Sequence, residues 1–185
     1  MCAIEDPSSE LSDAVAEMKL QQSSLKPVSP VVENPAKRMA GQLMERWPTI
    51  LGAGTLAPVA RRWRTQISEL AKAPAQFEEL PEADHNMLAG TVHPEALFGR
   101  TMVVFLRAAA QHPRNLLRLD LTRQGMMVEG FNTDMIEGRG RTRLAQQWTC
   151  LHFGDYVAYY LAMAYGADPT PVEALESLKA RLQES

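Results

Sequence analysis

A glycine turn after Leu51 is the stretch of this chain best suited to hold an anion. Gly52-Ala53-Gly54-Thr55 interrupts a short apolar run and precedes a segment with helical periodicity. Such a turn directs backbone N–H groups and the N-terminus of the next helix at one point, which favours phosphate and other anions. With Leu56 and Ala57, it also fits the loose dinucleotide pattern G-x-G-x-x-G/A. The ordinary alternative is a tight turn that needs glycine only for its backbone angles.

Three titratable side chains downstream of this turn could move protons. Glu69 lies near the end of the segment that follows the turn, His85 lies in a polar stretch, and Lys179 is close to the C-terminus. A carboxylate can act as a general base, and a histidine can donate a proton near neutral pH. Each also has an ordinary interpretation: Glu69 pairs with Lys72 at i+3, and the other two are solvated surface groups.

Two further clusters carry weaker signals. Arg61, Arg62 and Arg64 are expected to form the solvated face of a helix, with a phosphate-facing role as the second interpretation. His152 and Asp155 share a helix face at i, i+3, but a metal site requires more converging ligands. We therefore expect this pair to pack and form hydrogen bonds within the domain, and we predict no metal site.

The elements that must position these residues follow an α/β order. A strand, a glycine turn, a helix and a second strand predict a parallel sheet, because parallel neighbours need a crossover connection. We expect strands at residues 49–51, 73–77, 101–106 and 126–131. We expect helices starting at Asp6-Pro7 and at Thr170-Pro171, with others at residues 35–47, 56–67, 81–90, 112–124 and 142–165. These elements predict a three-layer αβα domain with a mostly parallel sheet.

Connections and faces complete this outline. Residues 21–34 are expected to be a linker and residues 132–141 a mobile loop, while 101–106 is apolar throughout, as in a central strand. In the first helix, Leu11, Val15 and Met18 lie on one apolar face. In the last helix, we expect Val172, Leu175 and Leu178 to face inward.

Composition excludes several classes of protein. The net charge of −3 over 185 residues argues against a general nucleic-acid binder. The first ten residues lack the features of a signal peptide, and no apolar run approaches the ~18 residues of a membrane helix. Cys2 and Cys150 have neither metal nor disulfide-framework spacing, so a reducing cytosol fits best and we expect a cytoplasmic protein.

Four blocks of sequence carry a resemblance to a known family. They are NPAKRMA (34–40), LAPVARRWRTQ (56–66), ELPEADHN (79–86) and HFGDYVAYYLAMAYGADPTPVEALESLK (152–179). Their order and lengths resemble the second sugar-isomerase (SIS) domain of the bifunctional phosphoglucose/phosphomannose isomerases. The resemblance implies a flavodoxin-like SIS fold and interconversion of glucose 6-phosphate or mannose 6-phosphate with fructose 6-phosphate through a cis-enediol, without cofactor or metal.

The resemblance also implies roles for individual residues. Glu69 matches the base that carries a proton between C2 and C1 of the sugar. His85 matches the histidine that opens the sugar ring and that, in the family, reaches in from the other subunit of a dimer. Lys179 matches a lysine that assists ring opening, and Thr55 and Gln66 are implied as substrate contacts. The implied partners are a phosphorylated hexose and a second copy of the chain.

This chain departs from the family pattern at several points. Leu51 and Ala53 stand where the family often has tyrosine and serine, and Leu70 stands where it often has a polar residue. The family has two SIS domains, whereas residues 34–185 match only the second. Residues 1–33 are interpreted as a helical arm and linker, either the end of the first domain or an N-terminal arm that packs on its own domain. We therefore predict little or no isomerase activity for these residues alone.

Three alternatives come from other classes of protein. One is a sugar-phosphate sensor that binds its ligand without turnover, which replacement of Glu69 by Gln would distinguish from an enzyme. The others are a nucleotide-dependent oxidoreductase and a purely structural dimerisation domain. The isomerase itself is either a fragment of a longer enzyme or a chain that works beside a separate partner.

Overall fold

The computed structural model describes residues 6–183, so Cys2 lies outside the described residues. The strands are β1 (Trp47–Ala53), β2 (Gln76–Leu80), β3 (Thr101–Arg107) and β4 (Asn132–Glu137). The α-helices are α1 (Ser8–Leu25), α2 (Pro35–Leu43), α3 (Ala57–Leu70), α4 (Ala83–Asn86), α5 (Pro113–Val128), α6 (Arg143–Tyr165) and α7 (Glu173–Gln183). Short 3-10 helices are η1 (Gly54–Leu56), η2 (Leu88–Gly90) and η3 (Glu95–Arg100).

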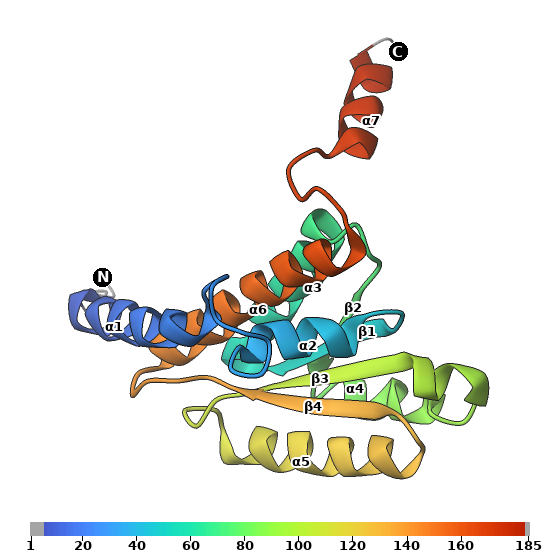
Figure 1. The fold of residues 1–185 in the computed structure, drawn as a ribbon. Coiled ribbons are helices and arrows are strands. Elements are labelled where there is room, and N and C mark those ends of the chain that lie inside the picture. Colours follow the sequence, from blue (N-terminus) through green and yellow to red (C-terminus); the bar gives the residue numbers. More distant parts are fainter. Residues whose placement is uncertain (1–5, 184–185) are drawn as a thin grey trace.

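The strands of the described residues form one parallel sheet in the order β2-β1-β3-β4 (Figure 1). Strand β3 is central and buried on both faces, as its continuous apolar run predicts. Helices α1, α2, α3 and α6 cover one face, and α4 and α5 cover the other. The predicted three-layer αβα fold is therefore confirmed.

Helices α3 and α6 form the core of the larger helical layer. The predicted inner face of α3 is confirmed, because Val59, Trp63 and Ile67 are all buried. Helix α6 also follows its prediction: Thr142 Oγ1 accepts a hydrogen bond from Ala145 N at 3.1 Å, which caps the start. It ends at Gly166, whose φ of 65° is the left-handed conformation that favours glycine there.

The predicted edge strand at residues 126–131 is wrong. Helix α5 continues through Val128 because Met126 packs beneath the sheet with Leu119, and both side chains are fully buried. The edge strand is instead β4, in the segment expected to be a loop. Its polar residues suggested a loop, but an edge strand exposes part of its side chains to water. Similarly, β2 lies three residues later than predicted, and its glutamates are tolerated at the opposite edge.

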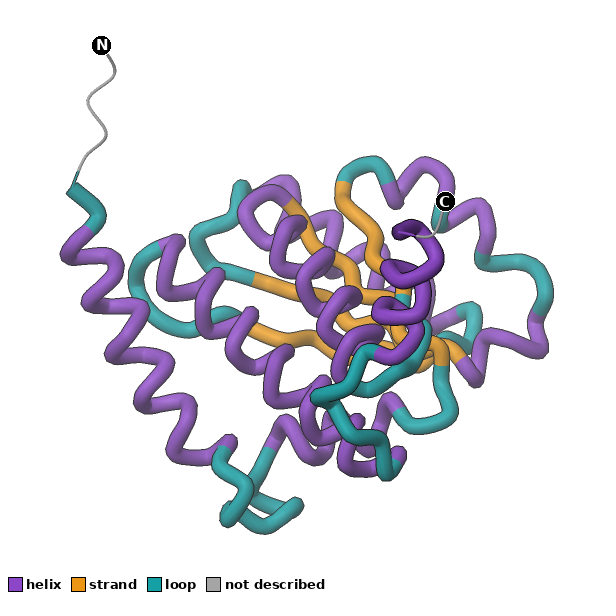
Figure 2. Tube along the Cα trace, turned by 90° about the horizontal axis from the view of Figure 1, so that it is seen from above, coloured by secondary structure: helices purple, strands orange, loops and turns teal. Residues whose placement is uncertain are grey.

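The N-terminal helix packs along α6 (Figures 1 and 2), and it continues to Leu25, beyond the predicted start of the linker. Its buried face carries Ala14 and Gln21, whereas Leu11 and Val15 are 46% and 44% exposed. Helix α1 thus buries Ala14, Gln21 and Leu25 rather than Leu11 and Val15, and its contact with α6 includes polar pairs. Gln21 Oε1, for example, lies 2.8 Å from the imidazole Nδ1 of His152.

The C-terminal helix does not pack inward as predicted. Helix α7 projects from the body of the domain in Figure 1, with Leu175 and Leu178 exposed. The segment before α7 is held instead by Lys72, whose Nζ donates to Pro171 O at 2.6 Å. Helical amphipathicity predicted the helix itself, but it does not determine which surface the helix meets.

The connection between α2 and β1 is longer than predicted. Helix α2 ends at Leu43, and Trp47 begins the strand rather than ending the helix. Between them Glu45 has a φ of 59°, and its backbone N–H donates to the hydroxyl of Tyr165 at 2.9 Å. This bond from the end of α6 replaces a helical continuation and fixes the entry into β1.

Candidate active site

The glycine turn lies at the carboxyl end of β1 and leads through η1 into α3. A Cβ atom at position 52 would lie 2.5 Å from the carbonyl oxygen of Leu56, and Gly54 has a φ of 52°. Both positions therefore require glycine on steric grounds. Thr55 is half-buried; its carbonyl accepts a hydrogen bond from Gln147 Nε2 at 2.6 Å.

Three glutamines hold the loops at this end of the sheet, and sequence reasoning did not identify them. Gln111 Nε2 donates to Ala53 O at 2.8 Å, and Gln146 Oε1 accepts from Ala110 N at 2.9 Å. With Gln147 on Thr55, they join the glycine turn to α6 and to the loop after β3. The available signal was the pair of adjacent glutamines in the otherwise aromatic-rich helix 142–165.

The carboxylate of Glu69 is exposed near the C-terminus of α3. The predicted ion pair with Lys72 is not formed, because Lys72 Nζ donates to the backbone oxygen of Glu69 at 2.7 Å. Within residues 6–183, no hydrogen bond or ion pair engages the Glu69 carboxylate. It is therefore free to act on a ligand.

His85 is exposed on α4, the short helix that follows β2. The helix is anchored by Asp84, which accepts from Thr122 Oγ1 at 2.6 Å and pairs with Arg118 at 3.5 Å. In the described part of the chain the imidazole itself has no hydrogen-bond partner. Helix α4 is therefore held in place while the imidazole of His85 remains exposed to solvent.

The structure does not bring Glu69, His85 and Lys179 together within one chain. Glu69 belongs to a helix that covers one face of the sheet, and His85 belongs to the segment that covers the other. Edge strand β2, about 17 Å long for its five residues, joins the two segments. Lys179 is exposed on α7, away from the sheet.

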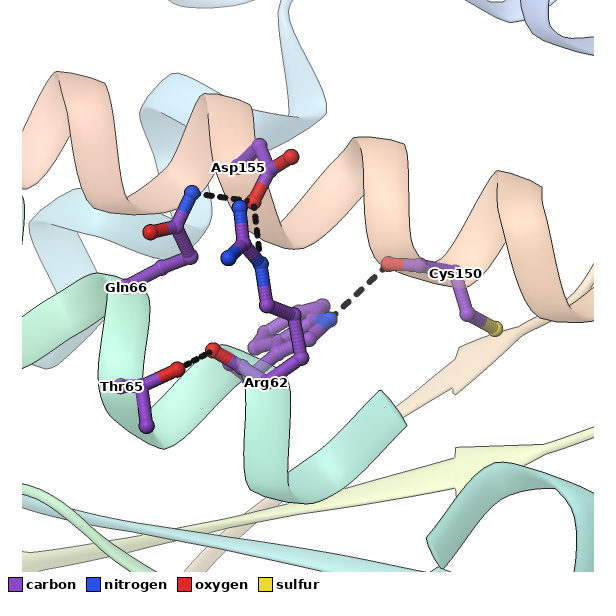
Figure 3. Close-up of polar contacts among 6 residues, drawn as sticks. Arg62, Thr65, Gln66, Cys150 and Asp155 are labelled. Atoms are coloured by element: carbon purple, nitrogen blue, oxygen red, sulfur yellow. Dashed lines mark hydrogen bonds and ion pairs between the residues drawn. The ribbon is translucent and has the colours of Figure 1, made fainter. Parts of the chain in front are cut away.

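Gln66 points into the interface between α3 and α6 (Figure 3). Its Nε2 donates to Asp155 Oδ1 at 2.9 Å, and the same oxygen lies 3.8 Å from Arg62 Nε. Beside this pair, Trp63 Nε1 donates to the carbonyl oxygen of Cys150 at 2.9 Å. The predicted hydrogen-bonding role of Asp155 is confirmed, and one member of the basic cluster is engaged in the same contact.

The imidazole of His152 is hydrogen-bonded to Gln21 of α1. Its ring meets the edge of Tyr156 at 5.1 Å between centroids. Burial lowers the pKa of His152, and the nearby Asp155 carboxylate opposes that shift only in part. No group of three or more metal-binding side chains occurs in the described residues.

Over the same residues, no helix has the length and apolar character needed to cross a membrane.

Replacing Asp155 with Ala is expected to cost about 1–2 kcal/mol of unfolding free energy, because it leaves the 9% exposed Gln66 amide without its acceptor. The matched change Arg62→Gln should cost less than about 1 kcal/mol, since that ion pair is half-exposed. Urea unfolding of both variants measures the difference. A larger loss for Arg62→Gln than for Asp155→Ala would contradict this account.

Comparisons with known proteins agree over nearly the whole chain. Residues 32–182 match a family model described as the bacterial phospho-glucose isomerase C-terminal SIS domain. A bifunctional phosphoglucose/phosphomannose isomerase of Caldicellulosiruptor bescii is 36% identical over 184 residues, which cover 98% of this chain and 54% of that protein. A protein of the same name from Aquifex aeolicus is 33% identical over 174 residues, covering 94% of this chain and 52% of the relative.

A solved structure shares the fold. The glucose-6-phosphate isomerase like protein from Thermus thermophilus superposes with a TM-score of 0.79 at 24% identity, covering 91% of this chain and 56% of that one. The chain thus spans about half the length of the curated relatives that it matches.

Proposed function

We propose, from the premise that this chain belongs to the bacterial phospho-glucose isomerase C-terminal SIS domain family, that it is the second half of a phosphoglucose/phosphomannose isomerase. The observation that carries this proposal is the 36% identity to one such enzyme over 98% of the chain. Residues 34–185 would be the SIS domain and residues 1–33 the arm that connects it to a first SIS domain. We expect a cytoplasmic homodimer that serves glycolysis and gluconeogenesis.

The proposed reaction needs a base that reaches two adjacent sugar carbons. The Glu69 carboxylate, which has no partner in the described residues, would take the proton from C2 of the open-chain sugar and return it to C1. Neighbouring hydrogen-bond donors, many of them from the first domain, would stabilise the enediolate. Aldose and ketose phosphates would then interconvert without a change in oxidation state of the molecule as a whole.

The other proposed site residues would open the sugar ring or contact the substrate. His85 would transfer the proton that opens the ring, and Lys179 would assist it. Thr55 and Gln66 would contact the substrate. Because the Nε2 atom of Gln66 is bonded to Asp155, the group left for a substrate is its side-chain oxygen.

The positions of the two principal residues favour a site shared between chains. Glu69 and His85 lie on segments that cover opposite faces of the sheet, so one chain does not present both to one hexose. In a two-fold dimer, the His85 of one copy can meet the Glu69 of the other. Helix α7 is exposed in the single chain, which leaves Lys179 available to the same assembly.

The test uses the isolated chain and a fusion of it to the first half of the Caldicellulosiruptor bescii relative. In a coupled assay with fructose 6-phosphate, the fusion should form glucose 6-phosphate, and the isolated chain should be slower by at least about 10³-fold because it lacks most substrate-positioning groups. A folded, dimeric fusion without turnover would overturn the proposal. Equal rates for the two proteins would overturn the expectation that a first domain is needed.

A further inference from the structure

A cavity of about 570 Å³ opens at the amino ends of the strands, the edge of the sheet opposite the glycine turn. In Figure 1 this edge lies at the right, where β1 and β3 begin. The lining comes from the α2–β1 connection, the strand starts, the segment between β2 and β3, and the end of α5. It includes Trp47, Met87, Leu97, Met126 and Phe131.

The walls are mainly apolar, with a few hydroxyl groups. Trp47 and Leu97 are 47% and 53% exposed, so large apolar side chains are open to a ligand there. Thr49 and Thr91 are buried and contribute polar atoms to an otherwise hydrophobic lining. An apolar cavity of this size with a few polar groups is the usual form of a small-molecule site.

The rim of the cavity is positively charged. Arg46 and Arg100 line it and also line an adjoining hollow of about 650 Å³, together with Glu45. Arg46 Nη1 donates to Gln42 O at 2.5 Å, and among the described residues the guanidinium of Arg100 has neither a hydrogen bond nor an ion pair. Neither arginine pairs with Glu45, so the rim carries an excess positive charge that suits an anionic group.

The walls are fixed by contacts of their own. The rings of Phe98 and Phe131 stack with centroids 4.4 Å apart, and Asn132 Nδ2 donates to the carbonyl oxygen of Gly99 at 2.8 Å. On the other side, the bond from Glu45 N to Tyr165 holds the α2–β1 connection. A preformed cavity loses little entropy on binding, which favours a ligand site over a transient gap.

We propose that this cavity binds a small molecule with an apolar ring and one acidic group. The ring would lie against the apolar wall that includes Trp47 and Leu97, and the acid would lie at Arg46 and Arg100. The lining contains none of Thr55, Gln66, Glu69, His85 and Lys179. This cavity is therefore separate from the proposed isomerase site.

The test uses anilinonaphthalene sulfonate, which combines apolar rings with one acid and fluoresces when bound. We expect saturable binding at one site per chain, which Trp47→Ala weakens and Trp148→Ala leaves unchanged. Trp148 is the matched control, because it is 42% exposed and lines a different apolar hollow. Arg100→Ala should weaken binding about tenfold, through loss of a charge-assisted contact. Arg114→Ala should leave it unchanged, because Arg114 is exposed on α5 and outside the lining.

Further probes separate the parts of the ligand. The uncharged phenylnaphthylamine should bind about tenfold more weakly than the sulfonate. Inorganic phosphate, which lacks the apolar rings, should displace the sulfonate poorly. Leu97→Trp, an exposed position where the fold should tolerate a larger ring, should block the sulfonate while melting at the parent's temperature. The proposal is overturned if binding is not saturable, if Trp148→Ala weakens it as much as Trp47→Ala does, or if Arg100→Ala and Arg114→Ala behave alike.

Discussion

Glu69→Gln in the fused enzyme is expected to lower kcat by about 10³-fold while leaving KM for fructose 6-phosphate nearly unchanged. The amide has the size of the carboxylate but cannot accept the proton from C1 of fructose 6-phosphate, so binding is kept and proton transfer is lost. The fold should not change, because the Glu69 side chain is exposed and has no partner in the described residues. Initial rates across a range of substrate concentrations give both constants.

A control variant at another glutamate tests whether the loss of one negative charge, rather than the loss of the base, lowers kcat. Glu129→Gln removes one exposed carboxylate at the end of α5, far from Glu69 in the chain, and should leave kcat unaltered. If Glu69→Gln retained full turnover, Glu69 would not be the base. If it lost binding and turnover equally, the residue would act as a binding group instead.

Mixing two inactive variants tests whether the site is shared between chains. Glu69→Gln and His85→Gln should each be inactive, but a mixed dimer has one site with both natural residues. Random pairing should therefore restore about a quarter of the parent activity. No recovery after confirmed subunit exchange would mean that both residues act within one chain, against the separation of their segments by the sheet.

Local patterns predicted those parts of the fold whose surroundings are uniform. The apolar run at 101–106 is buried on both faces, and the spacing of Val59, Trp63 and Ile67 matches a helix facing a sheet. Strand β4 escaped prediction because its pairing with β3 is a long-range contact and its own residues are polar. The position of α7 likewise depends on a surface that its sequence does not describe.

The candidate site divides in the same way. Glu69 and His85 were identified through the resemblance to a family, because each alone looks like a solvated surface charge. The glutamines that hold the carboxyl-end loops were missed, since Gln111 and Ala53 are 58 residues apart and meet only in the folded chain. Sequence spacing reveals which residues share a helix face, but it does not reveal partners across the sheet.

Gly154→Ala is expected to destabilise the domain by about 3 kcal/mol or more, although alanine is ordinarily the better helix former. The indole of Trp63 crosses α6 at this point, and its Nε1 donates to the carbonyl oxygen of Cys150. A Cβ atom on residue 154 would lie 2.1 Å from Trp63 Nε1, and the indole is only 1% exposed, with no free space to move into. Helix α3 would have to shift, which would also strain the bond between Gln66 and Asp155.

The matched control is Gly125→Ala, because this helical glycine of α5 is exposed and has no atom within 4 Å of an added Cβ. It should stabilise the protein by about 0.5–1 kcal/mol, so the two identical changes should move the melting temperature in opposite directions. Trp63→Phe should relieve part of the Gly154→Ala penalty, giving a favourable coupling energy in a double-mutant cycle. If Gly154→Ala melted at or above the parent's temperature, the close contact between α3 and α6 that positions Glu69 would not exist as described.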